Sequence, residues 1–469
     1  LKDAAAAAIY GSRATGGVVL VTTKKGSEGK PIVSYNGNLG LQHNMLSNYK
    51  NKIVDSQTWL RANNEGAIND GASRIYSEEL ISEYNGSDPL KPAKTHWFDW
   101  IKKNALQQTH DISFRGGSEK LNSYISAGYV FQDGLLMNDD YHKWNFQANL
   151  NWKALKKLSI NLNVFYSKED ITRPYIETSF ALRTAFNPPA QVYRYPNGIY
   201  NGGTLNYSGF NVAQAMAEGG NALYDYDKYR LSLNLQYEIF KNLFLKYTIA
   251  SNNNFNQMNI FQNMMDLYDS DGNFIRRTGP YGSTYSSANE NWNTDRYISN
   301  LITLDYSYST NIHQFTILAG FQSESNRTDN ISATGLKFVN NELREIAASI
   351  GSGTDFSGTS LASDWAMASF ISRVTYTLKD KYILEATTRY DGSSRFSPRH
   401  RWGLFPSVSA AWRMNMEDWM QGLNWLSHLK PRVSYGQLGN QGTNLYPFAT
   451  TVNRDTWAFG KGTVSTASI

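Results

Sequence analysis

Tyr229–Ile239, with the sequence YRLSLNLQYEI, alternates apolar and polar side chains along its whole length. Successive side chains of a β-strand point to opposite sides, so one face of this strand is apolar and the other is polar. The first face suits hydrocarbon and the second suits water. A tilted strand of about ten residues crosses a bilayer, and the stretch therefore predicts one strand of a transmembrane β-barrel.

Two earlier stretches repeat this alternation. Trp144–Trp152 sets tryptophan, phenylalanine, alanine and leucine against asparagine and glutamine. Leu158–Ser167 sets leucine, isoleucine, valine and tyrosine against serine and asparagine, with Phe165 as the one apolar residue of its polar side. The repetition predicts many similar strands side by side, since a barrel needs the same pattern all round.

Most connections between the predicted strands are alternately short and long, as in an up-and-down barrel of the outer membrane, where long loops face outward. The exceptions are two short outer loops and one inner connection, 415–429, which is predicted to form a small helix that carries tryptophan. The long connections span about 43–106, 169–228, 254–296 and 326–365. Loops of this length usually serve function. The predicted strands, about thirteen in number, are 32–42, 108–115, 121–132, 141–152, 158–168, 229–239, 243–253, 297–308, 314–325, 366–378, 382–390, 404–413 and 431–437.

Composition agrees with a large barrel. The chain has 469 residues, 14% of them aromatic, yet its mean hydropathy is −0.49 and it contains no run of about 18 apolar residues that would form a membrane helix. Alternation explains the low mean, since half of each barrel strand is polar. The absence of cysteine excludes disulfide scaffolds and cysteine-based sites, and the net charge of +5 is spread too evenly for a nucleic-acid interface.

Residues 1–26 differ from the rest of the chain. Asp3 is placed to cap a helix in the alanine run that follows it, and Gly11 is placed to end that helix. A bend at Gly16 and Gly17 then leads into Val18–Thr23, whose β-branched residues predict a strand. The segment is thus expected to form a small α/β element distinct from the barrel wall.

Five stretches together resemble a known family. Residues 1–26, LKDAAAAAIYGSRATGGVVLVTTKKG, resemble the end of the plug domain in TonB-dependent outer-membrane transporters of the SusC/RagA type. Further matches follow in order along the chain, so the resemblance spans nearly all of it. They are HDISFRGGSEKLNSYISAGYVFQDG from His110, RYDGSSRF from Arg389, FPSVSAAWRM from Phe405 and RVSYGQLGNQG from Arg432.

The resemblance implies an all-β protein: a transmembrane antiparallel barrel of about 22 strands around an α/β plug. About thirteen strands are predicted here. The chain is therefore expected to be a fragment, with the C-terminal end of the plug in 1–26 and a partial barrel in 27–469.

The resemblance also implies a function. Such transporters import oligosaccharides or peptides actively across the outer membrane of a Gram-negative, Bacteroidetes-like bacterium. A SusD-like surface lipoprotein would act as the lid, and the TonB–ExbB–ExbD complex would supply energy. No cofactor is implied.

Two other classes of protein remain open. A passive or adhesive outer-membrane barrel would bind a surface partner without energised transport, but it needs no plug, and the 1–25 element argues for one. The strands of a soluble β-sandwich or propeller would also alternate apolar and polar side chains, although its short and long loops need not lie at opposite ends.

Aromatic side chains near predicted loops are candidates for substrate binding, because sugar sites combine aromatic faces with polar groups. The alternative is that these side chains pack the loops or join the aromatic girdle at the membrane interface. The candidates are Trp97, Trp100, Tyr193, Tyr195 and Tyr200.

Charged residues of the plug segment and of the inward face of the wall are candidates for plug–barrel contacts. The alternative is that they face water in the lumen. The candidates are Arg13, Lys24, Glu238, Glu385 and Arg389.

Motifs for catalysis or metal binding are missing from the sequence. The stretch from Asp269 to Asn273 resembles the start of a calcium loop, but position twelve is Pro280 in place of a glutamate, so a β-turn is predicted. There is no HExxH pair and no GxSxG elbow. The chain is therefore not expected to be an enzyme or to hold a metal.

Overall fold

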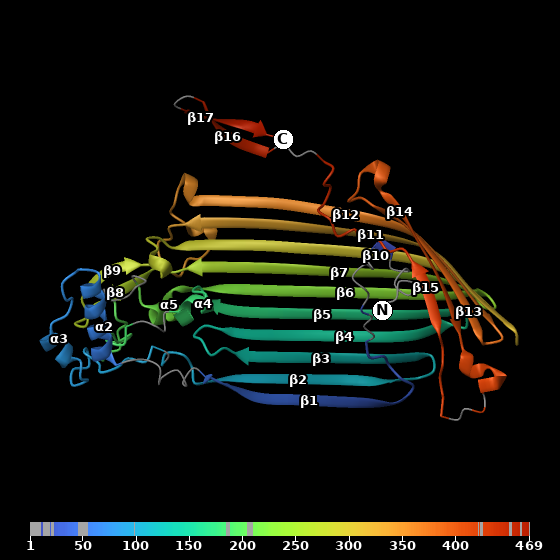
Figure 1. Ribbon diagram of the computed structural model, residues 1–469, viewed down its shortest axis with the longest axis horizontal. Coiled ribbons are helices and arrows are strands. Elements are labelled where there is room, and N and C mark those ends of the chain that lie inside the picture. Colours follow the sequence, from blue (N-terminus) through green and yellow to red (C-terminus); the bar gives the residue numbers. More distant parts are fainter. Residues whose placement is uncertain are drawn as a thin grey trace.

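The computed structural model describes residues 11–12, 19, 23–45, 55–97, 99–183, 188–203, 210–420, 422, 425–449, 453–459 and 462–468. Within these ranges, thirteen antiparallel strands form one sheet in which neighbours along the chain pair with each other (Figure 1). This confirms the predicted up-and-down topology. The strands of the sheet are β1 (Gly29–His43), β2 (Asn104–Gly117), β3 (Leu121–Asp133), β4 (Asp140–Leu155), β5 (Leu158–Pro174), β6 (Gly220–Phe240), β7 (Leu243–Gln262), β10 (Ser287–Ser309), β11 (His313–Leu336), β12 (Phe356–Leu378), β13 (Tyr382–Ser393), β14 (Trp402–Trp412) and β15 (Arg432–Gly436).

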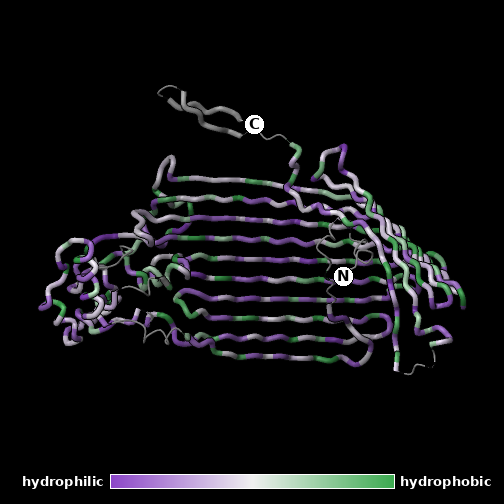
Figure 2. The backbone as a smooth tube through the Cα atoms, in the orientation of Figure 1, coloured by the Kyte–Doolittle hydropathy of each residue, from purple (hydrophilic) through white to green (hydrophobic). Residues whose placement is uncertain are grey.

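One face of the sheet is an apolar belt bordered by aromatic rings, and the alternation along each strand is visible in Figure 2. In β4, Trp144 and Trp152 both point to this face and are exposed. They are eight residues apart, which corresponds to about 26 Å along the strand, close to the height of a barrel's membrane belt. Other rings reinforce the two borders, since Tyr129 lies 4.2 Å from Trp144 and Tyr382 lies 6.1 Å from Trp412 between ring centroids.

Several strands continue past their predicted outer ends. The long connections are therefore shorter than expected, at 44–103, 175–219, 263–286 and 337–355. The physical reason is visible in β6, where residues 224–228 (YDYDK) remain paired with β5 and β7 although their polarity no longer marks a lipid-facing side. Beyond the membrane both faces of a strand meet water, so hydropathy stops marking the strand while its hydrogen bonds continue.

The tight turns lie where the sequence predicts them. Lys379 and Asp380 both adopt positive φ, 48° and 56°, as a type I′ turn between two twisted strands requires. On the same rim, the described residues after β14 form two 3₁₀ turns, η8 (Met414–Met416) and η9 (Asp418–Met420), where the sequence predicts a small helix in 415–429.

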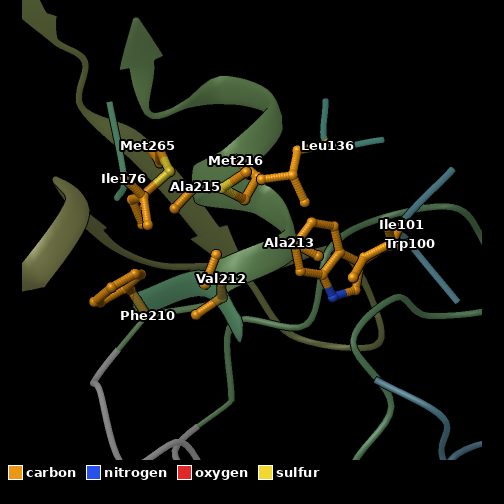
Figure 3. Close-up of a cluster of buried hydrophobic side chains, with 11 residues drawn as sticks. Trp100, Ile101, Leu136, Ile176, Phe210, Val212, Ala213, Ala215, Met216 and Met265 are labelled. Carbon is orange, nitrogen blue, oxygen red and sulfur yellow. The ribbon is translucent and has the colours of Figure 1, made fainter. Parts of the chain in front are cut away.

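The outer connections fold into a small helical unit at one end of the sheet (Figure 1). Its apolar core joins Trp100, Phe210, Met216 and Met265 from separate connections (Figure 3). No helix within the described ranges is long and apolar enough to cross a membrane. The remaining elements are α2 (Ser56–Asn69), α3 (Glu78–Glu83), α4 (Thr178–Arg183), α5 (Val212–Glu218), β8 (Met265–Tyr268), β9 (Phe274–Thr278), η4 (Pro280–Gly282), η5 (Ile346–Ala348), η6 (Gly353–Asp355), η7 (Pro398–His400), β16 (Asn453–Phe459) and β17 (Gly462–Ser468).

Candidate functional site on the inner wall

The face opposite the apolar belt is polar, and we call it the inner wall. Strand register aligns Asn149 of β4 with Asn163 of β5 and Ser232 of β6 on this face. The same row continues to Ser299 of β10 and Glu324 of β11, which are both buried. Ser299 Oγ and Glu324 Oε1 both accept from the side-chain amide of Gln322, so polar side chains of this face bury one another in part.

Residues 23–26, which precede β1, lie against this inner wall at β3 and β4. The buried Asn149 donates from Nδ2 to the carbonyl oxygen of Lys24, over 2.6 Å, and lies 3.5 Å from Thr23 Oγ1. A Cβ at Gly26 would lie only 2.4 Å from the backbone nitrogen of Ser123. Glycine therefore permits the close approach of the two backbones here.

A second contact joins Ser12 to the inner wall at β12 and β13. The backbone N–H of Ser12 donates to Asp391 Oδ2 over 2.9 Å, and its hydroxyl lies 3.6 Å from the sulfur of Met367. Asp391 Oδ1 accepts in turn from Arg389 Nε over 2.6 Å. Arg389 and Asp391 are 1% and 3% exposed, so this is a buried ion pair that water screens little.

Neighbouring strands hold Arg389 in place. Its Nη2 donates to Ser369 Oγ over 2.9 Å and to Gln322 Oε1 over 3.1 Å. Ser369 is fully buried on β12 and Gln322 lies on β11, so three strands share the guanidinium. A buried charge is stable only when paired and hydrogen-bonded in this way.

Ser12 also contacts a later segment of the chain. Gln441, in the segment after β15, donates its backbone N–H to the carbonyl oxygen of Ser12 over 3.0 Å. A Cβ at Gly439 would lie 3.2 Å from the Cα of Ser12. Ser12 thus contacts both the wall and the segment that follows β15.

The structure brings together some of the residues that were predicted to join the plug to the barrel. Arg389 lies at the Ser12 contact, and Lys24 takes part through its carbonyl oxygen in place of its side chain. Glu385 instead accepts from Thr375 of the neighbouring strand over 3.4 Å, and Glu238 lies at the inner end of β6. Arg13 lies outside the described residues, as does most of the α/β element predicted in 1–26.

Asp391 and Asn149 are functional candidates that the sequence analysis missed. Both carry signals that could have found them. Asp391 follows Arg389 by two residues in a strand, so both point the same way, and Asn149 lies on the polar side of the Trp144–Trp152 alternation.

The two candidate tryptophans are buried within the outer connections. Trp97 is 1% exposed, donates from Nε1 to the carbonyl oxygen of Pro188 over 3.1 Å, and contacts the ring of Tyr193. Trp100 is 6% exposed and belongs to the apolar core of these connections. Neither ring offers a face to a ligand in this arrangement, which matches the loop-packing alternative.

The candidate tyrosines are half-buried. Tyr195 donates to Asn201 Oδ1 over 2.6 Å, and burial raises the pKa of its phenol. Tyr200 lies under the guanidinium of Arg194, 5.0 Å from ring centroid to carbon, and lines an outer cavity of about 650 Å³ between the connections. Tyr200 is therefore the candidate that best keeps access to a ligand.

The predicted turn at Asp269 is confirmed. Its carboxylate accepts from the backbone N–H groups of Asp271 and Asn273 over 3.0 and 2.8 Å, and from the side chain of Asn273. These bonds lower the pKa of Asp269. Within the described part of the chain, no three acidic or histidine side chains are grouped so as to hold a metal ion.

Comparison with sequences of known proteins agrees with this geometry. The TonB-dependent receptor P3 of Formosa agariphila is 29% identical over 455 residues, which cover 95% of this chain and 42% of that receptor. The TonB-dependent receptor SusC of Bacteroides thetaiotaomicron is 28% identical over 472 residues, which cover 94% of this chain and 43% of SusC. No family model matches. The resemblance to SusC/RagA-type receptors is confirmed, and the chain spans less than half the length of these relatives.

Solved structures show the same fold. The RagAB peptide importer in its open-open state superposes with a TM-score of 0.80 at 20% identity, covering 100% of this chain and 53% of that chain. The closed-closed state gives a TM-score of 0.80 at 21% identity, covering 100% of this chain and 54% of that chain. The thirteen-stranded sheet thus has the fold of about half of such a barrel, which confirms the predicted fold class.

Proposed function

We propose that this chain forms part of a TonB-dependent importer in the bacterial outer membrane, with residues 1–26 as the end of its plug and 27–469 as barrel wall. One observation carries the proposal: Ser12 is hydrogen-bonded to the buried Arg389–Asp391 pair on the inner wall. A passive or adhesive barrel has no reason to hold a preceding segment inside its wall by a buried ion pair.

The chemistry of the contacts suits a plug that stays docked until it is pulled. Ser12 and Lys24 are both held through backbone groups, by the side chains of Asp391 and Asn149. Each bond is individually modest, at about 1 kcal/mol net, or about 2 kcal/mol where the acceptor is charged. A few such bonds hold the segment at rest, and a mechanical pull can break them one at a time.

The proposal includes partners and cargo. TonB with ExbB and ExbD would supply energy, and a SusD-like lipoprotein would cover the outer end, where the helical unit of the connections lies. The cargo would be an oligosaccharide or a peptide. SusC and the RagAB peptide importer supply the analogy for these partners, because this chain resembles them over nearly its whole length.

Uptake by intact cells tests this function. Cells that carry the full-length protein would be given a labelled maltohexaose, a labelled hexagalacturonate and a labelled hexapeptide, with the tonB gene present or deleted. We expect accumulation of at least one probe, and its loss on deletion of tonB. Accumulation that is independent of TonB would indicate a passive barrel, and surface binding without entry would indicate an adhesin.

A further inference from the structure

One level of the inner wall carries aromatic rings between amide and guanidinium groups. Strand register pairs Phe165 with Arg230, Arg230 with Asn252, and Asn252 with Tyr297. Three strand spacings separate Phe165 from Tyr297, which is about 14 Å. The row continues through Asn326 to Trp365, whose ring centroid lies 6.3 Å from that of Tyr297.

Phe165 is the residue that breaks the polar pattern of its strand. Its ring places an apolar face on a wall that is largely polar, and such a face can stack on a partner. Arg230 supplies one contact, with its guanidinium carbon 5.5 Å from the ring centroid. Phe165 remains half-exposed, which leaves ring surface for a second partner.

Phe165, Arg230 and Tyr297 line one cavity of about 630 Å³ between the inner wall and residues 23–25. Asn149, Asn163 and Asn252 add amide groups to the same cavity. Aromatic faces beside side-chain amides match the alternating apolar faces and hydroxyl edges of a sugar ring.

The charge of this cavity is positive. Its described lining contains Lys25 and Arg230 and no carboxylate. Among the described residues, Arg230 donates only from Nε, to Asn252 Oδ1 over 3.2 Å, so both Nη groups can reach a ligand. The nearby Asp295 already accepts from Asn326 and Thr328 over 2.9 and 2.8 Å.

We propose that this cavity binds an anionic oligosaccharide during import, with Phe165 and Tyr297 stacking on sugar rings and Arg230 and Lys25 binding its carboxylate or sulfate groups. The proposal rests on the proposed function, because it assigns a cargo class to the lumen of the importer. It makes Arg230 and Phe165 specificity residues, each with a distinct test.

Calorimetric titration of the full-length protein in detergent provides that test. The probes are hexagalacturonate, a sulfated carrageenan hexasaccharide, uncharged maltohexaose and an acidic hexapeptide. We expect binding of one or both anionic sugars at least about tenfold tighter than of the other two, and weaker binding at higher salt. The first two probes distinguish carboxylate from sulfate as the recognised group.

Matched variants assign the effect to this cavity. Arg230→Gln should weaken binding of the anionic sugar about tenfold or more, whereas Arg230→Lys should retain most of it. Phe165→Leu should weaken binding about fivefold, and Phe165→Tyr should not. Arg327→Gln, which removes an exposed arginine paired with Asp329 on the opposite face, serves as the control and should have no effect.

Equal binding of maltohexaose or of the peptide, or unchanged binding by a folded Arg230→Gln protein, would overturn the proposal. These results differ from a failure of the proposed function. If maltohexaose or the peptide still enters cells in a TonB-dependent way, the importer is retained and only its anionic cargo is wrong.

Discussion

Arg389 is an inward-facing residue that the sequence singles out, and its burial decides what it can do. A guanidinium in contact with water contributes little to stability, but a buried one that donates to Asp391, Ser369 and Gln322 is part of a network. The wall therefore presents Asp391 to Ser12 in a fixed orientation.

Asp391→Ala tests this network. The change leaves Arg389 buried without its counter-charge and removes the acceptor of Ser12, which should cost about 3 to 5 kcal/mol of folding free energy. Urea unfolding of the full-length protein in detergent measures it. Asp391→Asn keeps an acceptor for Ser12 and should lower the free energy of unfolding by less. Equal losses of unfolding free energy in the two variants would contradict the role of the charge.

Substitution of Gly11 tests the close contact between its backbone and Asp391. Its φ is +53°, and a Cβ there would lie 2.3 Å from Asp391 Oδ2. Gly11→Ala should thus weaken docking of the segment through both backbone strain and collision. Gly353 has nearly the same φ, +56°, and open space around its Cβ, so Gly353→Ala should cost only the strain, about 1 kcal/mol.

Protease sensitivity of the plug segment in the full-length protein would compare these two glycines. We expect faster cleavage near residue 11 in the Gly11→Ala variant alone. Equal cleavage in both variants would show that the collision with Asp391 does not occur.

The turn between β12 and β13, residues 379–381, lies beside a charged cluster at the inner rim. Glu417 accepts from Lys381 Nζ over 2.8 Å, from Trp412 Nε1 over 3.0 Å and from the hydroxyl of Tyr382 over 2.8 Å. These bonds lower the pKa of Glu417 to about 2. The cluster ties the segment after β14 back to the start of β13.

Acid titration should therefore loosen this rim. A carboxylate whose pKa is lower in the folded state than its ordinary value of 4.5 contributes fully above pH 4.5 and loses its contribution as pH falls towards 2. We expect the urea midpoint of the full-length protein to fall over this window, and to fall less in Glu417→Gln. Asp418→Asn, at a carboxylate that is 94% exposed, is the control; a steep fall that persists in Glu417→Gln would contradict this assignment.

Trp97 tests the helical unit of the outer connections. Because it is buried against Tyr193 and bonded to Pro188, Trp97→Ala should cost about 3 to 5 kcal/mol locally. The expected result is faster proteolysis of residues 44–103 and 175–219 in intact cells, with a smaller change for Trp97→Phe. Unchanged proteolysis would contradict the packing role of Trp97 in these connections.

The strands could be predicted from the sequence and the outer connections could not. Alternation in stretches such as Tyr229–Ile239 reports a boundary between lipid and water, so it identifies the part of each strand inside the membrane. Above the membrane the alternation no longer marks the strands, although β6 and β11 continue there in water. Burial of Trp97 depends on contacts between connections far apart in sequence, which no local pattern records.

The inner-wall site was predictable in part for the same reason. The alternation of side chains places Arg389 on the inner face and identifies Phe165 as an apolar residue on the polar face. It does not predict which residues of neighbouring strands lie opposite each other. Only the register of the whole sheet brings Phe165, Arg230 and Tyr297 to one level. The approach of Ser12 to Asp391 spans 379 positions in the chain and needs the folded wall.

At the scale of the whole molecule, the sheet corresponds to about half of a receptor barrel. Its outer face meets lipid, its inner wall meets the preceding segment, and its outer connections form a helical unit at one end (Figure 1). This division suits the proposed importer, since docking of a plug and capture of cargo would take place on surfaces that the membrane does not touch.

Cross-linking in the intact outer membrane tests whether the segment preceding β1 lies inside the wall. The chain contains no cysteine, so pairs can be introduced cleanly. Cells would carry the full-length protein with Ser12→Cys and Met367→Cys, or with Ser12→Cys and Phe370→Cys, whose ring points to the lipid-facing side. A short bis-maleimide followed by peptide mass spectrometry should link residue 12 to 367 and not to 370. Equal yields for the two pairs, or no link to 367, would contradict a plug docked on the inner wall.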